Sequence, residues 1–100
     1  MKKLVALYKA PADAAAFMAH YQDKHVPLVR KIPGLFKVEV TRIERTLMGE
    51  QGNFLLAEMY FEDHRFKEAM KSPENAATGQ DLGLFAEGLV TVMTGEVLER

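Results

Sequence analysis

Three short segments of this chain are apolar at almost every position, and this pattern limits the folds that the chain can adopt. The segments are residues 4–8, 54–61 and 89–93, the last of them in a strand expected at 89–98. A strand in an antiparallel sheet with one solvated face alternates apolar and polar residues. These strands are instead apolar on both faces, so we expect both faces of the sheet to be covered.

Helices can cover only one face of such a sheet, so something else must cover the other. A second copy of the chain, placed sheet against sheet about a two-fold axis, is the economical solution. A monomer would expose a larger apolar patch than soluble proteins usually do. The pattern therefore predicts a homodimer formed through the sheet faces. The alternative is that strands this short are apolar by chance.

Residues 12–32 are predicted to form one helix with an interruption near its end. Asp13 can cap its start. Pro27 removes a backbone donor and disfavours helical geometry at the preceding residue, so we expect a kink or a restart there. The apolar stripe of this helix is expected to contain Ala14, Phe17, Met18, Tyr21, His25, Leu28 and Ile32.

The rest of the chain completes an α+β pattern. A strand is expected at residues 35–45, followed by a glycine-containing hairpin loop at 46–53. Asp63 is predicted to cap one helix and Ser72 to cap another, and glycines should make residues 79–87 irregular. The order βαββαβ predicts a ferredoxin-like fold, an antiparallel sheet with the helices on one face.

Length and charge restrict the class of protein further. The 100 residues, 48% of them hydrophobic and 27% charged, indicate a single globular domain spanning 1–100. A net charge of −1 gives no electrostatic basis for binding nucleic acid. No apolar run is long enough to cross a membrane. The absence of cysteine excludes thiolate sites and disulfides and is compatible with a cytoplasmic location.

One motif resembles the signature of the EthD-like family, which belongs to the dimeric α+β barrel superfamily. The motif is Tyr21…His25-Val26-Pro27-Leu28…Ile32-Pro33-Gly34-Leu35, with further similarity in residues 57–63, 70–74 and 94–97. The resemblance implies two subunits paired sheet to sheet and a pocket in each subunit between sheet and helices. The family is named after a gene linked to ethyl tert-butyl ether degradation. Other members of the superfamily include cofactor-free monooxygenases, isomerases, cyclases and stress-responsive proteins.

His25 is the first candidate for a catalytic residue. A neutral imidazole can accept a proton near physiological pH, and the resulting cation can return it. A histidine inside an apolar stripe has no packing advantage and needs a hydrogen-bond partner. Two interpretations stay open. His25 is a proton shuttle in the wall of a pocket, or its ring donates to a backbone carbonyl and stabilises the kink at Pro27.

Tyr21 and Glu58 are the two other catalytic candidates. Tyr21 lies one helical turn before His25 and could orient the imidazole or bind a substrate oxygen, or it could be a core aromatic residue. Glu58 lies in mid-strand among apolar neighbours. It could orient His25, bind substrate, or pair with Lys or Arg on a neighbouring strand. Tyr8 and Tyr60 are expected to serve packing.

The sequence contains no recognisable cofactor or metal motif. His20 and His25 are five residues apart, which in an α-helix places them on different faces, so no metal site is predicted. There is no glycine-rich phosphate loop before a helix and no nucleophile elbow.

Two functions remain open. The first is a small cofactor-independent enzyme, such as a monooxygenase, isomerase or cyclase, that acts on a carbonyl or aromatic metabolite with His25 as the proton shuttle. The second is a non-catalytic protein that binds a small molecule or assists a pathway enzyme. A pocket in which His25 also meets a carboxylate or a second polar group would favour the enzyme.

Overall fold

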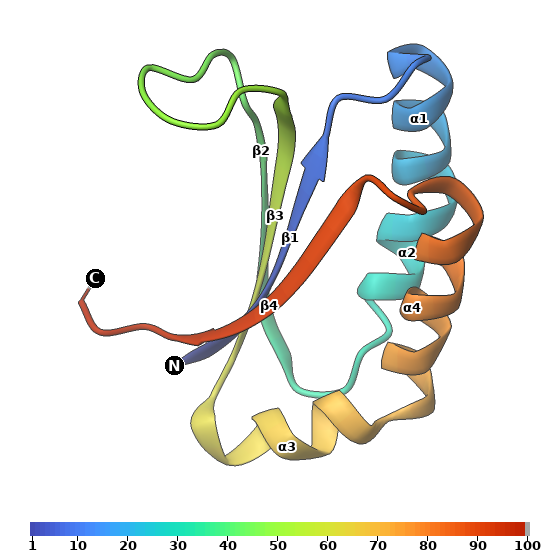
Figure 1. The fold of residues 1–100 in the computed structure, drawn as a ribbon. Coiled ribbons are helices and arrows are strands. Elements are labelled where there is room, and N and C mark those ends of the chain that lie inside the picture. The colour runs from blue at the N-terminus through green and yellow to red at the C-terminus, as the bar shows by residue number, and fades with distance from the viewer. Residues whose placement is uncertain (100) are drawn as a thin grey trace.

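The structure is a computed structural model that describes residues 1–99, and its element order confirms the βαββαβ pattern. Figure 1 shows a sheet with all the helices on one side of it. The elements are β1 (Lys2–Lys9), α1 (Ala14–His20), η1 (Tyr21–His25), α2 (Val26–Val29), β2 (Leu35–Arg42), β3 (Asn53–Phe61), α3 (Asp63–Lys71), α4 (Pro73–Phe85) and β4 (Val90–Glu96).

The sheet has four strands in the order β2-β3-β1-β4, and every neighbouring pair is antiparallel. This is the predicted ferredoxin-like α+β arrangement, with β1 and β3 in the centre and β2 and β4 at the edges. The second strand ends at Arg42, three residues before the expected position. A loop with two glycines at positive φ, Gly49 and Gly52, joins β2 to β3.

The predicted interruption of the first helix takes the form of one π-helical turn. Asp13 caps α1, and its Oδ1 atom accepts the backbone N–H of Ala16 at 3.0 Å. The turn η1 then closes with a bond from the N–H of Val26 to the carbonyl of Tyr21, five residues back. Pro27 lies in the first turn of α2, directly after the π-turn.

Helix α4 corrects the expectation that residues 79–87 are irregular. Ser72 caps it as predicted, accepting the N–H of Asn75 at 3.1 Å, and the helix continues past two glycines to Phe85. Tertiary packing outweighs the low helix propensity of glycine here, because α4 buries Thr78 and Asp81. The prediction for Asp63 was also wrong, since Glu62 occupies the cap position and makes no side-chain bond to the helix.

The core lies between the sheet and the helices. Every second residue of β3, such as Leu55 and Ala57, is buried there, as are Ala6 and Tyr8 of β1. None of the helices in residues 1–99 could span a bilayer, because none combines sufficient length with sufficient hydrophobicity.

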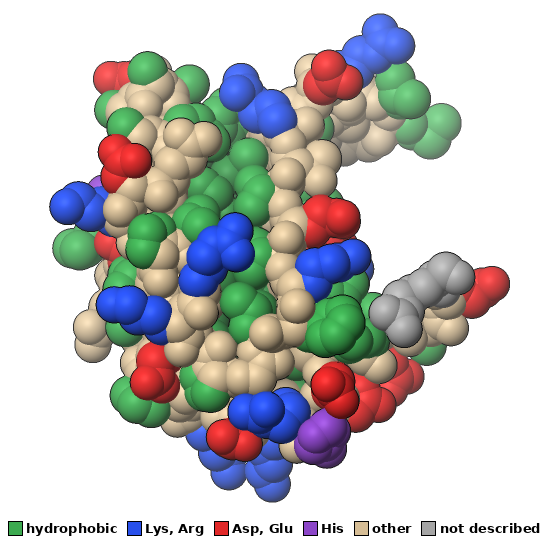
Figure 2. All heavy atoms as spheres, turned by 180° about the vertical axis from the view of Figure 1, so that it is seen from behind, with side chains coloured by type: hydrophobic (Ala, Val, Ile, Leu, Met, Phe, Trp, Pro, Cys, Tyr) green, Lys and Arg blue, Asp and Glu red, His purple; other side chains and the backbone are tan. Residues whose placement is uncertain are grey.

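The other face of the sheet carries no helix and is called the open face below. Val5, Leu7 and Leu56 are half-buried there, and Met93 is 43% exposed. Figure 2 shows that the molecule is hollowed on this side between the β2–β3 loop and the segment after β4. The open face therefore has an apolar centre, and the charged residues Lys3 and Glu58 lie on the same face.

A pair of glycine substitutions tests the backbone geometry. Gly34 has a φ of 79°, and a Cβ atom there would lie 3.0 Å from Cβ of Arg65, so Gly34→Ala should lower the free energy of unfolding by about 1 kcal/mol or more. Gly79 lies in a helix with open space around it, so Gly79→Ala should raise it by about 0.5–1 kcal/mol. Urea denaturation measures both, and equal effects would contradict the structure.

Candidate functional site

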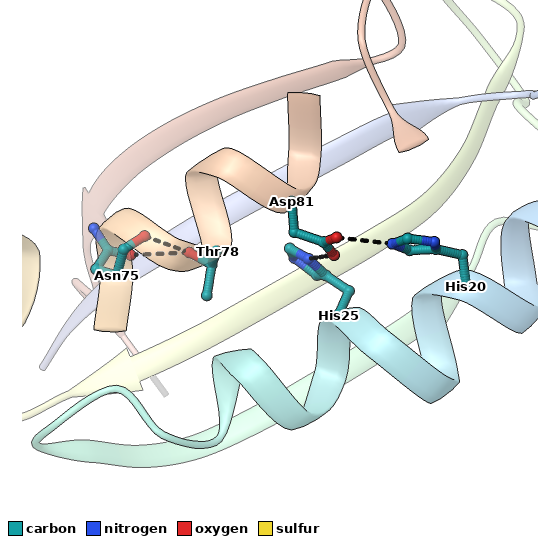
Figure 3. Close-up of polar contacts among 5 residues, drawn as sticks. All are labelled: His20, His25, Asn75, Thr78 and Asp81. Atoms are coloured by element: carbon teal, nitrogen blue, oxygen red, sulfur yellow. Dashed lines mark hydrogen bonds and ion pairs between the residues drawn. The ribbon is translucent and has the colours of Figure 1, made fainter. Parts of the chain in front are cut away.

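His25 is buried between η1 and α4 and bonds to an aspartate that sequence reasoning did not single out. Its side chain is almost fully covered, and its Nδ1 atom lies 2.9 Å from Oδ2 of Asp81 (Figure 3). His20 bonds to the same carboxylate, with 2.8 Å between its Nε2 atom and Oδ1. Asp81 is 7% exposed, so one buried carboxylate joins both histidines to α4.

The π-turn explains why both imidazoles reach one carboxylate. In an α-helix, residues five apart point about 140° away from each other. A π-turn is wider and bonds residue i to i+5, which brings His20 and His25 to the same side. The prediction that they lie on different faces was therefore wrong. The same turn keeps Phe17, Tyr21, His25 and Val29, each four residues apart, in the core, and Val29 takes the buried place expected for Leu28.

The hydrogen bonds assign the protonation states of the pair. Burial alone would raise the pKa of the Asp81 carboxyl, but bonds from His20 and His25 outweigh it and hold that pKa below its usual value. The carboxylate can only accept, so Nδ1 of His25 donates to it and Nε2 keeps its lone pair. Burial also lowers the pKa of the His25 imidazole, although Asp81 acts in the opposite direction. His25 is therefore a neutral base at pH 7.

A small cavity lies beside His25, between the sheet and the helices. The space in which the centre of a water molecule fits has a volume of about 20 Å³. This is room for about one water molecule. Most of the residues in its wall are aliphatic, and four others, Tyr8, Tyr21, His25 and Thr78, carry polar groups. The lining residues are Leu4, Ala6, Tyr8, Tyr21, His25, Val29, Ile32, Ala57, Met59, Thr78, Leu82 and Val92.

Tyr21 lies where the sequence predicted, next to His25 in the wall of the cavity. The two ring centres are 5.6 Å apart, and burial raises the pKa of the phenol to about 12. Within residues 1–99, no hydrogen bond joins Tyr21 to His25. Asp81 rather than Tyr21 orients the imidazole.

The structure does not bring Glu58 to the site. Glu58 lies on the open face, where one of its carboxylate oxygens is 2.6 Å from Nζ of Lys3 on the neighbouring strand. The sheet separates it from His25. The part of the chain described here has no group of three or more His, Cys, Asp or Glu side chains arranged to hold a metal ion.

Sequence reasoning missed Asp81 and His20, although a signal for Asp81 was present. Thr78, Asp81, Leu82 and Phe85 recur at helical spacing, and all four pack on the inner side of α4. An aspartate inside such a stripe needs a partner as much as a histidine does. The two glycines nearby concealed this periodicity. Nothing in the local sequence announces the π-turn that brings His20 into position.

Comparison with known proteins establishes the family. A family model described as the EthD domain matches residues 9–88. The chain belongs to the EthD family. A relative from Rhodococcus erythropolis, an uncharacterized 11.0 kDa protein in the thcB-thcC intergenic region, is 35% identical over 94 residues, covering 93% of this chain and 91% of the relative.

Solved structures agree with this assignment. The crystal structure of an EthD family protein from Bacillus halodurans is 47% identical, with a TM-score of 0.89 over 98% of this chain and 99% of that one. A dimeric ferredoxin-like protein of unknown function from Thermobifida fusca is 11% identical, with a TM-score of 0.64 over 96% of this chain and 90% of that one. At that identity the second likeness shows the fold alone.

The lowered pKa of His25 has a measurable consequence for stability. Because the unfolded chain binds a proton that the buried imidazole resists, the free energy of unfolding should fall as pH drops below about 6.5. In His25→Gln this fall should be smaller between about pH 7 and about pH 5. Denaturant titrations at both pH values measure it. His64, whose side chain is 73% exposed, supplies the control His64→Gln, which should behave as wild type. Equal slopes in all three proteins would contradict a buried neutral His25.

Proposed function

We propose that this EthD family member is a small enzyme that needs no bound cofactor and moves a proton on a small organic molecule. The molecule carries a carbonyl or aromatic group and occupies the cavity between sheet and helices, where His25 is the proton shuttle. The observation that carries the proposal is the pair of His25 and Asp81. A carboxylate holds the buried imidazole through Nδ1, and the same ring lines a cavity.

The pair suits reversible proton transfer. The neutral Nε2 atom accepts a proton from the ligand, and the resulting imidazolium is stabilised by the Asp81 carboxylate 2.9 Å away. The imidazolium then returns the proton to the ligand. Asp81 stays ionised and keeps the ring in one tautomer. General acid–base catalysis of this kind contributes about 10²–10⁴-fold to a rate.

A ligand must enlarge the cavity in order to enter it. Pockets for small molecules usually have volumes of about 300–1,000 Å³, far more than this cavity offers. The edge strand β4 is where we expect the opening, because Val92 lines the cavity and is still 47% exposed. Within residues 1–99, β4 pairs only with β1, so it can move without breaking a second strand pairing.

The same cavity is also compatible with a second candidate function. A protein that binds a small metabolite without converting it needs the same cavity but no proton transfer. In that case the His25–Asp81 pair serves only to connect η1 to α4. Measuring binding and proton exchange separately distinguishes the two candidates.

Hydrogen–deuterium exchange at carbon tests the catalytic proposal. We expect the protein to accelerate exchange of the α-hydrogens of cyclohexanone in D2O, measured by NMR. His25→Gln, which keeps hydrogen bonding but cannot shuttle a proton, should lower this rate at least about tenfold. Asp81→Asn should lower it as well, because the tautomer is no longer held. His64→Gln is the matched control and should exchange as wild type. Binding of cyclohexanone without any acceleration would support the second candidate instead.

We further propose that two copies pair through their open faces. Leu7, Leu56 and Met93 form an apolar centre on this face. At its border, the β2–β3 loop exposes Leu47 and Met48, which are 83% and 92% exposed. A second copy would cover both features about a two-fold axis. The dimeric description of the Thermobifida fusca protein supports this arrangement.

A single charge should separate such a dimer. Leu55 is 1% exposed in the core, whereas Leu56 lies on the open face, so Leu56→Lys is the informative change. It should convert the dimer to a monomer and lower the unfolding temperature, because dimer formation stabilises the folded state. Multi-angle light scattering at micromolar concentration measures the mass. Ala76→Lys, on the exposed surface of α4, should stay dimeric. A monomeric wild type would defeat the proposal.

A further inference from the structure

Tyr8 of β1 has a feature that its expected packing role does not explain. The residue is fully buried at 0% exposure. Its hydroxyl is the one buried side-chain polar atom without a hydrogen-bond partner in residues 1–99. Native proteins leave few such groups, because a buried unsatisfied hydroxyl is destabilising. Tyr8 also lines the cavity beside His25.

The Tyr8 ring has little freedom to turn away. It meets the rings of Phe17 and Tyr21 edge-on, with centres 5.5 Å and 5.7 Å apart. Burial raises the pKa of its phenol, and Tyr21 and Asp81 raise it further. The hydroxyl therefore keeps its proton and is a hydrogen-bond donor at any physiological pH.

The hydroxyl of Thr78, on the inner side of α4, already has a hydrogen-bond partner. Thr78 also lines the cavity, but its Oγ1 atom donates to the carbonyl of Asn75 at 2.7 Å (Figure 3). Nδ1 of His25 is likewise committed to Asp81. Two of the residues that line the cavity therefore carry a group without a partner in residues 1–99: Tyr8 has a buried hydroxyl donor, and His25 has the acceptor Nε2.

We infer that the Tyr8 hydroxyl binds the oxygen atom of the ligand, and that the ligand class is a small, largely apolar ketone or other enolisable carbonyl compound. This inference rests on the proposed function of the His25 site. The aliphatic lining accommodates the hydrocarbon part of such a molecule. Tyr8 donates to the carbonyl oxygen, and His25 acts on the carbon next to that carbonyl.

The proposed step is a balanced proton transfer. The C–H bond next to the carbonyl breaks, and its proton moves to Nε2 of His25. The electron pair of that bond forms a carbon–carbon double bond, and negative charge develops on the carbonyl oxygen, which the Tyr8 hydroxyl stabilises. Return of the proton to carbon restores the ketone, so no oxidant or reductant is consumed. Loss of one donor to such an oxygen costs about 10²–10³-fold in other enzymes.

Tyr8→Phe removes only the hydroxyl and tests the inference in two ways. Exchange of cyclohexanone α-hydrogens in D2O should fall at least tenfold, while the pH at which the rate is half-maximal should stay where His25 places it. The unfolding midpoint of Tyr8→Phe should equal or exceed that of wild type, because the hydroxyl has no partner to lose. Tyr60→Phe, the same change outside the cavity, is the control and should exchange as wild type.

Each outcome has a definite meaning. A lowered midpoint would show that the hydroxyl already has a structural partner and would overturn the inference. If Tyr8→Phe exchanges as fast as wild type while His25→Gln exchanges slowly, the inference is overturned and the proposed function stays intact.

If none of the proteins accelerates exchange, an NMR titration with cyclohexanone measures binding instead. Binding by wild type that is at least tenfold tighter than by Tyr8→Phe keeps Tyr8 as the oxygen-binding group and rejects catalysis. Equal binding, or no binding by wild type, rejects the role of Tyr8.

Discussion

The Asp81 carboxylate is the interaction on which the helical layer and the candidate site both depend. A buried carboxylate is strongly unfavourable unless it is paired and hydrogen-bonded. Here each oxygen accepts one imidazole N–H, at 2.8 Å and 2.9 Å. This requirement couples the position of α4 along its axis to that of α1 and η1. It also places an oriented imidazole in the wall of the cavity. The same carboxylate therefore fixes the packing of the helices and the orientation of His25.

Much of the fold could be predicted because its signals are local. The cap residues Asp13 and Ser72 act within three residues of their own position. The restart at Pro27 follows from the missing N–H of proline. The strands apolar on both faces pointed to a sheet with an uncovered side, which the structure has. The family motif around His25 led to the residue that lies beside the cavity.

The rest of the site could not be predicted because it depends on contacts between distant segments. Asp81 is 56 residues from His25 in sequence, and two glycines made its helix look irregular. For Glu58, orienting His25 and pairing with a basic residue both stayed open, because sequence alone does not tell which face of a strand a residue occupies. Tyr8 was expected to serve packing, which its ring does. Its unpartnered hydroxyl becomes visible only once the surrounding atoms are placed.

The π-turn gives the first helical segment a tolerance to a change of length that composition does not reveal. One π-turn is equivalent to an α-helix that has gained a single residue, and each residue of an α-helix rotates the following ones by about 100°. Removing one of the exposed residues 22–24 would restore a regular helix. The residues that follow would keep their facing, so Val29 and Ile32 would stay in the core, and His20 and His25 would lie four residues apart on one side of the helix. Among homologous sequences, a single deletion should therefore be accepted in this turn more readily than in the regular turns of α1.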